Sequence, residues 1–264
     1  MNKKYLLDKH NLDLIQEKIT EAENILLFLD YDGTLAFFKA EPLLAFALPK
    51  IIKSLKKLEK SSKYYLSLVS GRKLSELKNM IDLRRSNYAG SHGLEIELFF
   101  KEDVVYPYQD KRLDELSRKS YQKIKEKYVE SETVKLEDKG IGFALHIDSE
   151  SRQKEIERKL KVIFENTAYQ LLSGRKIIEV RPEGWDKGKA VDYITNQIKD
   201  NLDLDNILRI YIGDDRTDED AFKVLEDGIR IYVKNEDGLN TEADYYLNDP
   251  DDTAKLLKKL AGEL

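Results

Sequence analysis

The sequence predicts an α/β fold, in which a parallel sheet covered by helices on both faces carries a small inserted α+β domain. Three apolar runs of strand length indicate the sheet, because each ends in polar residues and precedes a helix-like pattern. These runs are ILLFL before Asp30, YYLSLV before Ser70 and ILRIYI before Gly213. Continuous apolar strands that alternate with helices are typical of a parallel sheet buried on both faces.

Helical periodicity follows the second of these runs directly and occurs again later in the chain. It is seen at Leu74, Leu77 and Ile81, and again after Gly188 at Ala190, Val191, Ile194 and Ile198. Ligands of open α/β sheets bind beyond the carboxyl ends of the strands. We therefore expect one crevice to collect the polar residues at these ends. They are Asp30, Asp32, Ser70, Asp214 and Asp215.

The middle of the chain follows another pattern. A helix expected over 110–128 leads to a stretch in which Ile141, Phe143, Leu145 and Ile147 alternate with other residues, the period of a half-exposed antiparallel strand. Residues 137–140, EDKG, are a turn candidate just before it.

An amphipathic helix comes next, with Ile156, Leu160 and either Ile163 or Phe164 on its apolar face. It is followed by YQLLSGRKIIEVRP, which predicts a hairpin around Ser173 and Gly174. We interpret residues 107–182 as an inserted α+β domain, and residues 1–106 and 183–264 as the α/β core.

Composition excludes several functional classes. The chain has 264 residues, of which 36% are charged, but 45 basic and 50 acidic side chains nearly cancel to a net charge of -5. A nucleic acid or an anionic membrane is therefore not expected as partner. The absence of cysteine rules out disulfides and thiolate sites. Without a long apolar run or a signal-peptide core, we expect a soluble, cytoplasmic protein.

Asp30 and Asp32 carry the most specific signal. Residues i and i+2 of an extended segment project to the same side, so both carboxylates can face one ligand. Such crowding costs energy unless a cation compensates it or one carboxyl is protonated. Gly33 permits a sharp turn out of the strand. The plainer alternative is that one aspartate caps a helix and the other belongs to a turn.

Three further elements fit an anionic ligand. Ser70, at a strand end before a helix, can donate to an anion, although taken alone it is more commonly an ordinary N-cap. Lys187 precedes a helix and suits a phosphate, although a lone lysine is more commonly a solvated surface residue. The acidic segment GDDRTDED at 213–220 suits Mg²⁺. A helix dipole explains Glu219 and Asp220, but not two adjacent aspartates ending an apolar strand.

The motifs DYDGTL, SGR, Lys187-Gly188 and GDDRTDEDAF, in this order, resemble the four motifs of haloacid dehalogenase-like phosphatases. The insert lies between the second and third, where one class of cap domain sits. More narrowly, GSHGLE at 90–95, ALH at 144–146, EVRP at 179–182 followed by KGKA, and the fourth motif resemble the trehalose-6-phosphate phosphatase family. Related sucrose-phosphate and mannosyl-phosphoglycerate phosphatases usually carry a GDSxND-like fourth motif, which this chain lacks.

This resemblance implies a Rossmann-like parallel-sheet hydrolase core with an inserted α+β cap domain. It implies a nucleophile, Asp30, that forms an aspartyl-phosphate, and an acid/base, Asp32, that protonates the leaving sugar oxygen and then activates water. Lys187 and Ser70 would offset charge on the phosphoryl oxygens. Mg²⁺ is implied as cofactor. Its ligands would be the Asp30 carboxylate, the Asp32 backbone carbonyl and Asp214, with Asp215 or Asp218 in support.

The resemblance implies a small-molecule sugar phosphate, trehalose 6-phosphate, as substrate. Charged and amide side chains bind sugar hydroxyls well, although a solvated cap face explains the same residues. The expected substrate-binding residues are Gly71, Arg72, His92, Glu137, Lys139, Glu179, Arg181 and Glu183.

Other interpretations stay open on the sequence. The same chemistry on sucrose phosphate or on mannosyl- or glucosyl-phosphoglycerate is the nearest alternative, since a fold of this kind hosts many substrates. A phosphomutase and a catalytically inactive regulatory domain are further alternatives, but a dead copy is expected to lose Asp30, Asp32 or the acidic fourth motif. We expect a monomer, and the resemblance admits a trehalose-phosphate synthase as partner.

Overall fold

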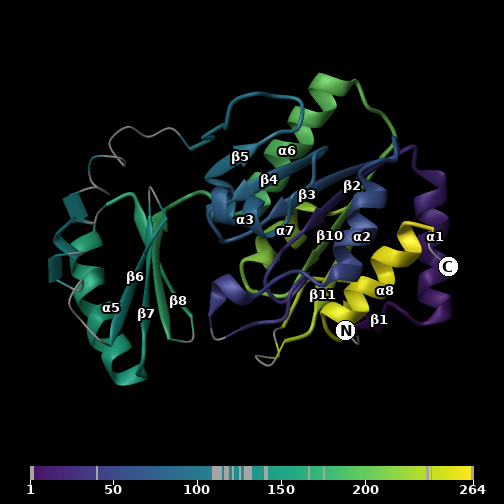
Figure 1. Cartoon of the computed structure of the whole chain (residues 1–264). Coiled ribbons are helices and arrows are strands. Elements are labelled where there is room, and N and C mark those ends of the chain that lie inside the picture. Colours follow the sequence, from purple (N-terminus) through teal and green to yellow (C-terminus); the bar gives the residue numbers. More distant parts are fainter. Residues whose placement is uncertain are drawn as a thin grey trace. The chain divides into compact units, whose positions relative to one another are not determined.

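The structure is a computed structural model (Figure 1), and its described residues form two compact units. The core unit comprises Met1–Pro107 and Asp186–Leu264, and the insert unit comprises Tyr108–Trp185. The described residues are 3–39, 41–108, 115, 119–120, 122–124, 126–127, 133–139, 142–165, 167–174, 176–235, 238 and 240–262.

The core unit is built on a sheet with the strand order β1-β12-β11-β10-β2-β3-β4-β5. All neighbouring strands are parallel except β4 and β5, which are antiparallel. The strands are β1 (Lys4–Tyr5), β2 (Asn24–Leu29), β3 (Tyr64–Val69), β4 (Ser86–Gly90), β5 (Glu95–Glu97), β10 (Ile207–Gly213), β11 (Ile229–Val233) and β12 (Tyr245–Leu247). The parallel α/β fold predicted from the sequence is confirmed.

The three predicted strands β2, β3 and β10 lie side by side at the centre of the sheet. The helices of the core unit are α1 (Lys9–Glu21), α2 (Pro49–Leu58), α3 (Leu74–Met80), α6 (Lys187–Leu202), α7 (Asp218–Val224) and α8 (Pro250–Leu260).

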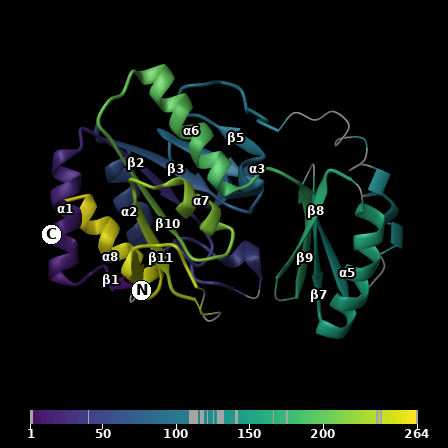
Figure 2. The same cartoon turned by 180° about the vertical axis from the view of Figure 1, so that it is seen from behind.

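Alternate residues of the central strands face opposite layers of helices. Ile25, Leu27 and Leu29 of β2 pack in one core with buried residues of α1, α2, α3 and α8. On the other face, α6 contacts β3 and α7 contacts β10, and Figure 2 shows these two helices in front of the sheet. A central strand that is buried on both faces must be apolar throughout, which explains the continuous apolar runs.

The insert unit contains an antiparallel sheet with the order β6-β7-β9-β8, packed against the helix α5 (Glu150–Phe164). Its apolar core settles an alternative left open by the helical pattern: Phe164 is 4% exposed and belongs to the core, whereas Ile163 is 43% exposed. The strands are β6 (Val134–Asp138), β7 (Phe143–Ile147), β8 (Tyr169–Gly174) and β9 (Ile177–Pro182).

Two hairpins shape this sheet. Between β6 and β7 the Lys139 N–H donates to the Gly142 carbonyl, and between β8 and β9 Ser173 and Gly174 pair with Ile178 and Ile177. The predicted β8–β9 hairpin is thus present, with its turn just after Gly174. The predicted position of Ile141 and most of the helix expected over 110–128 lie outside the described residues.

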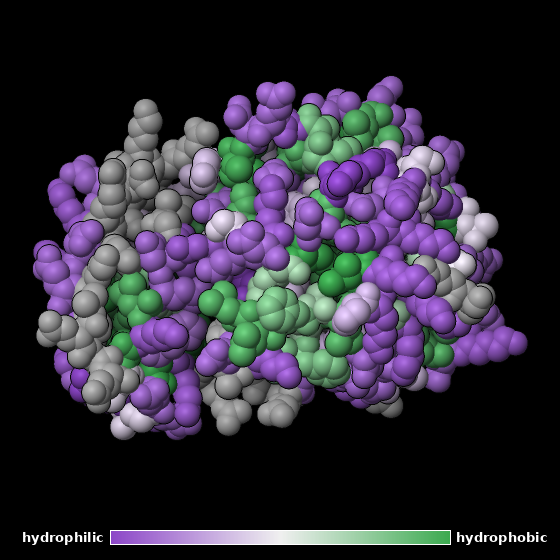
Figure 3. Space-filling model, in the orientation of Figure 1, coloured by the Kyte–Doolittle hydropathy of each residue, from purple (hydrophilic) through white to green (hydrophobic). Residues whose placement is uncertain are grey.

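The molecular surface is mainly hydrophilic on the side shown in Figure 3, with apolar side chains gathered in patches. Exposed large apolar side chains of the core unit cluster between β2 and α2, at Phe37, Phe38, Leu43, Leu44 and Phe46. No helix within the described ranges combines the length and the apolar character needed to cross a membrane.

Candidate active site

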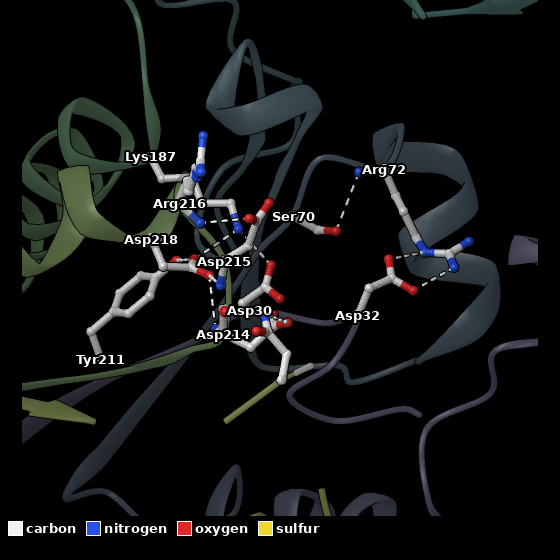
Figure 4. A network of polar contacts seen from close by, with 11 residues as sticks. Asp30, Asp32, Ser70, Arg72, Lys187, Tyr211, Asp214, Asp215, Arg216 and Asp218 are labelled. Carbon is white, nitrogen blue, oxygen red and sulfur yellow. Dashed lines mark hydrogen bonds and ion pairs between the residues drawn. The ribbon is translucent and has the colours of Figure 1, made fainter. Parts of the chain in front are cut away.

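Polar residues follow the three central strands at the same edge of the sheet (Figure 4). Asp30 follows β2, Ser70 follows β3 and Asp214 follows β10. The Asp30 N–H donates to the Ile212 carbonyl of β10 at 2.9 Å, which extends the pairing of the two strands to the start of the site. Parallel pairing therefore brings residues nearly 200 positions apart to one place.

Three buried carboxylates form a tight cluster. Asp30, Asp214 and Asp218 are 4%, 1% and 0% exposed, and carboxylate oxygens of all three lie within 4.8 Å of one another. Gly33 brings the turn after β2 against this cluster, because a Cβ there would lie 2.2 Å from Asp214 Oδ2 and its φ is +76°. Both the space and the backbone conformation thus require glycine.

Lys187, the first residue of α6, places a buried ammonium among these carboxylates. Its Nζ lies 2.6 Å from Asp30 Oδ1 and 2.8 Å from Asp218 Oδ1. The helix begins here because the Asp186 side chain accepts from the Lys189 N–H and caps it. Burial lowers the pKa of Lys187, but the two carboxylates outweigh burial and raise it, so the side chain stays charged.

The pKa values of Asp30 and Asp214 are also raised, which for a carboxyl group favours the neutral form. Burial raises the pKa of Asp30 to about 7; the charge of Lys187 opposes this rise and that of Asp218 adds to it. Burial, together with the charges of Asp30 and Asp218, raises the pKa of Asp214 well above its ordinary value. One ammonium is therefore insufficient to keep all the carboxylates ionised, and the site favours an additional cation.

Asp218 accepts from four donors. Its Oδ1 accepts from Lys187 Nζ and from the hydroxyl of Tyr211, and its Oδ2 accepts from the N–H groups of Asp214 and Asp215. A carboxylate has about four acceptor positions, so these contacts occupy both oxygens. This arrangement suits a role in holding the site together. Asp215 itself is exposed.

Asp32 does not share the direction of Asp30. Both of its oxygens accept from the guanidinium of Arg72, each at 2.6 Å, and Arg72 also lies over the ring of Tyr31. Figure 4 shows this pair apart from the acidic cluster. The expectation that residues i and i+2 project together holds only within an extended strand, and β2 ends at Leu29, before both aspartates.

The loop that carries Ser70 and Arg72 is fixed by a second loop, η2 (Ser91–Gly93) with its neighbours. The Ser91 N–H donates to the Arg72 carbonyl, and the His92 N–H donates to the Ser70 carbonyl. The His92 ring packs so closely on Gly71 that a Cβ there would lie 2.8 Å from its Cε1. His92, which was predicted to bind substrate, thus packs against the loop of Ser70 and Gly71.

The N-terminus of α3, which follows this loop, already has an anionic partner. The Leu74 N–H donates to the Glu95 carboxylate at 3.0 Å. Ser70 Oγ accepts from the Arg72 N–H at 3.2 Å, so the hydroxyl helps to shape the loop and keeps its own proton for another acceptor.

The predicted substrate residues of the insert unit lie on β6, β9 and the ends of these strands. Glu137 Oε2 and His146 Nε2 form a hydrogen bond at 2.8 Å, and Lys139 Nζ lies 3.5 Å from Glu179 Oε1. Arg181 is buried, whereas Glu183 is exposed. Burial raises the pKa of Glu137, but its bond to His146 and the charge of Lys139 lower it to below its ordinary value.

Two residues that contact the site were not recognised from the sequence. Tyr211 lies inside an apolar run, where a tyrosine is normally a core residue. Asn235 lies in the segment after β11, and its side-chain amide donates to the Asp214 carbonyl at 2.7 Å. No short sequence motif marks this residue. The usable signal for Tyr211 was its position two residues before Gly213, on the same side of the strand.

A parallel core sheet, with acidic residues after two central strands and a lysine at the start of a later helix, gives this chain the fold of haloacid dehalogenase-like hydrolases. The crystal structure of such a hydrolase from Bacteroides thetaiotaomicron is similar, with a TM-score of 0.62 at 17% identity, over 90% of this chain and 99% of that one.

More specific relatives are found at higher similarity. The C-terminal domain of C. albicans trehalose-6-phosphate phosphatase matches with a TM-score of 0.82 at 21% identity, over 99% of both chains. Probable trehalose-phosphate phosphatase I of Arabidopsis thaliana is 34% identical over 266 residues, covering 92% of this chain and 70% of the plant protein. The trehalose-phosphatase family model matches residues 28–251. The chain belongs to the trehalose-phosphatase family.

Proposed function

We propose that the protein is a Mg²⁺-dependent phosphatase that hydrolyses trehalose 6-phosphate to trehalose and phosphate. The observation that carries this proposal is the buried cluster of Asp30, Asp214 and Asp218 around Lys187, in a chain of the trehalose-phosphatase family. A buried nucleophile beside a fixed positive charge is what phosphoryl transfer needs.

The residues present fit a bound Mg²⁺. Asp214 Oδ1 is buried and has no hydrogen-bond partner among the described residues, so an acceptor points into the cluster unused. Hard carboxylate oxygens at this density are the ligands that Mg²⁺ prefers. Asp30, Asp214 and the Asp32 backbone carbonyl would hold the ion, with Asp215 or Asp218 in support. Bound there, Mg²⁺ supplies positive charge that offsets the phosphate dianion.

The first chemical step is attack by Asp30. A carboxylate oxygen forms a bond to phosphorus while the bond from phosphorus to the sugar oxygen breaks, which leaves an aspartyl-phosphate. Lys187 touches Asp30 and lies where it can also offset charge on the phosphoryl oxygens. Ser70 Oγ keeps its proton available for one of these oxygens.

Asp32 handles the protons in both steps. It gives a proton to the leaving sugar oxygen, and then takes one from the water that attacks the aspartyl-phosphate, releasing phosphate and restoring Asp30. In the structure both Asp32 oxygens accept from Arg72. Proton transfer therefore requires at least one of these hydrogen bonds to open, and the released Asp32 oxygen to take up a proton from solvent, before the sugar oxygen leaves. The guanidinium of Arg72 can then also bind an anionic or hydroxyl group of the substrate.

Recognition of the disaccharide is assigned to the insert unit. Glu137, Lys139, Glu179, Arg181 and Glu183 bring charged groups to β6, β9 and their ends. Their acceptors and donors suit the hydroxyls of a sugar. Gly71 and His92 support the loop of Ser70 from the core unit.

Three further proposals concern the oligomeric state, the location and the partner of the protein. They are a monomeric state, a cytoplasmic location and an association with a trehalose-phosphate synthase. Size-exclusion chromatography of the chain, alone and mixed with the synthase, tests the first and third.

The function is tested by phosphate release from a panel of substrates. The panel contains trehalose 6-phosphate, sucrose 6-phosphate, mannosyl- and glucosyl-phosphoglycerate, glucose 6-phosphate and an aryl phosphate. Each is measured with Mg²⁺ and with EDTA, for the wild type, for Asp30→Asn and for the control Asp200→Asn, which changes an exposed aspartate of α6.

A strong preference for trehalose 6-phosphate, lost in EDTA and in Asp30→Asn but kept in Asp200→Asn, is the expected result. Preference for another sugar phosphate with the same dependence would retain the mechanism and overturn the substrate. No release by a folded protein that binds Mg²⁺ would favour a regulatory domain.

A further inference from the structure

Tyr211 reaches the site from the middle of β10. Its side chain is fully buried, and its ring makes an edge contact with Phe222 of α7, with centroids 5.6 Å apart and planes at 88°. Its hydroxyl donates to Asp218 Oδ1 at 2.6 Å. The ring is therefore held by packing and the hydroxyl by one carboxylate, at a fixed place behind the acidic cluster.

Asp218 joins two parts of the site. Through Oδ1 it holds Lys187, and through Oδ2 it accepts from the N–H groups of Asp214 at 3.0 Å and Asp215 at 2.9 Å. A shift of this carboxylate would therefore move both the ammonium and the loop that presents Asp214. Tyr211 is the side chain that holds Asp218 from the side of the sheet (Figure 4).

Lys187 is shared between two competing acceptors, with 2.6 Å to Asp30 and 2.8 Å to Asp218. A carboxylate that receives a strong hydrogen bond from a phenol attracts a neighbouring ammonium less strongly, because part of its charge is already compensated. The Tyr211 hydroxyl thus shifts the balance of Lys187 toward Asp30.

We infer that Tyr211 is a positioning residue of the phosphatase reaction, whose hydroxyl fixes Asp218 and thereby keeps Lys187 beside Asp30. This inference rests on the proposed function and adds a residue to its machinery. Loss of the hydroxyl leaves Lys187 bound more closely to Asp218, and the positive charge available at Asp30 and at the phosphoryl group falls. The rate of the chemical step therefore drops, while binding of the sugar is unchanged.

A purely structural role is the competing interpretation, and Tyr88 of β4 provides a matched control. Tyr88 is equally buried, but its hydroxyl donates to the backbone carbonyls of Ile81 or Leu83 and accepts from the Leu83 N–H. Tyr88→Phe and Tyr211→Phe each remove one buried phenol hydroxyl, so both should lower stability. A positioning role predicts that they differ in kinetics.

The experiment measures kcat and KM for trehalose 6-phosphate with saturating Mg²⁺, together with thermal stability. Tyr211→Phe is expected to lower kcat about tenfold, equivalent to about 1.4 kcal/mol, with KM changed less than about twofold. Tyr88→Phe should leave kcat within about twofold of wild type. In an Asp218→Asn background, Tyr211→Phe should lower kcat less than about twofold further, because the group it acts through is already lost.

Equal kcat values for Tyr211→Phe and Tyr88→Phe, or fully additive losses with Asp218→Asn, would overturn the inference. Should Tyr211→Phe fail to fold, 3-fluorotyrosine placed at 211 or at 88 keeps the shape and the hydroxyl but changes its donor strength. A changed kcat at 211 alone supports the inference, and no change at either position overturns it. A wild type that releases no phosphate overturns the proposed function and this inference with it. If the wild type is active, the kinetics of the variants test the role of Tyr211 alone.

Discussion

The core and insert units hold their buried charges differently. In the core unit, Lys187 lies 2.6 Å from Asp30 and 2.8 Å from Asp218, and the three side chains are 3%, 5% and 0% exposed. In the insert unit, Lys139 lies 3.5 Å from Glu179, with side chains 10% and 13% exposed. The ion pairs of the core unit thus have shorter distances and are almost inaccessible to water, whereas the ion pair of the insert unit is longer and more exposed.

This difference separates chemistry from recognition. Groups that stabilise charge during a reaction act best when fixed in a site that excludes water, because no reorganisation is then needed as charge develops. Side chains that bind a sugar must exchange partners with hydroxyls and water, and a loose pair does so at lower cost. Breaking the two pairs in the same way should therefore change different kinetic constants.

The largest effect is expected for Lys187→Met. Loss of the ammonium leaves Asp30 and the phosphoryl group without their fixed positive charge, so kcat should fall about a hundred- to thousandfold. The measurement is steady-state phosphate release, with circular dichroism to confirm folding. A variant that is folded and keeps at least a third of the wild-type kcat would contradict the assignment of Lys187.

Lys139→Met is the matched change in the insert unit. We expect KM to rise about tenfold, the loss of one charged hydrogen bond, while kcat changes less than about threefold. The same assay measures both constants. If kcat instead falls as in Lys187→Met while KM stays constant, Lys139 belongs to the chemistry and the division between the units is wrong.

The pKa of Asp30 predicts a pH effect on the metal-free protein. Its carboxyl stays protonated to about pH 7 when folded, but ionises near pH 3.8 when unfolded, so the folded state holds an extra proton between these values. The stability that this proton contributes is lost as pH rises through about 7. In EDTA, the free energy of unfolding of Asp30→Asn relative to that of wild type should therefore increase by at least about 1 kcal/mol from pH 5 to pH 8.

Glu137 of the insert unit should behave in the opposite way. Its pKa is lowered on folding from 4.5, so its contribution is present above that value and is lost as pH falls through the folded pKa. Denaturant unfolding from pH 3 to pH 8 measures the free energy of unfolding of Asp30→Asn, Glu137→Gln and wild type. If the stability of Glu137→Gln relative to wild type does not rise as pH falls from about 6 to about 3, this sign is wrong.

The sequence allowed the centre of the fold to be predicted, but not its edges. The strands β2, β3 and β10 were recognised because strands buried on both faces are apolar throughout. The strands β1, β5 and β12 have only two or three residues, and β4 reads SNYAG, so no period marks them. The choice between Ile163 and Phe164 also needed the structure, since both fit a helical face.

The same limit applies within the site. Asp30, Asp214 and Lys187 were singled out by residue type and position and Asp218 by the family resemblance, and the structure brings all four together. The bond between Asp32 and Arg72 could not be predicted, because it depends on how the chain turns after β2. Contacts that depend on backbone direction over a few residues are beyond a pattern of residue types.

The smallest expected effect concerns strain beside the rigid site. Ser91 has a φ of +49°, a conformation that costs an L-residue about 1–2 kcal/mol, and its buried hydroxyl has no partner among the described residues. Ser91→Gly relieves both, so despite the added freedom of the unfolded chain it should stabilise the protein by about 0.5–1 kcal/mol, raising Tm by about 1–4 °C. Ser86→Gly, at another buried hydroxyl without a described partner but within strand β4, should instead lower Tm. Scanning calorimetry distinguishes the two, and a lowered Tm for both would show that the turn at Ser91 is not strained.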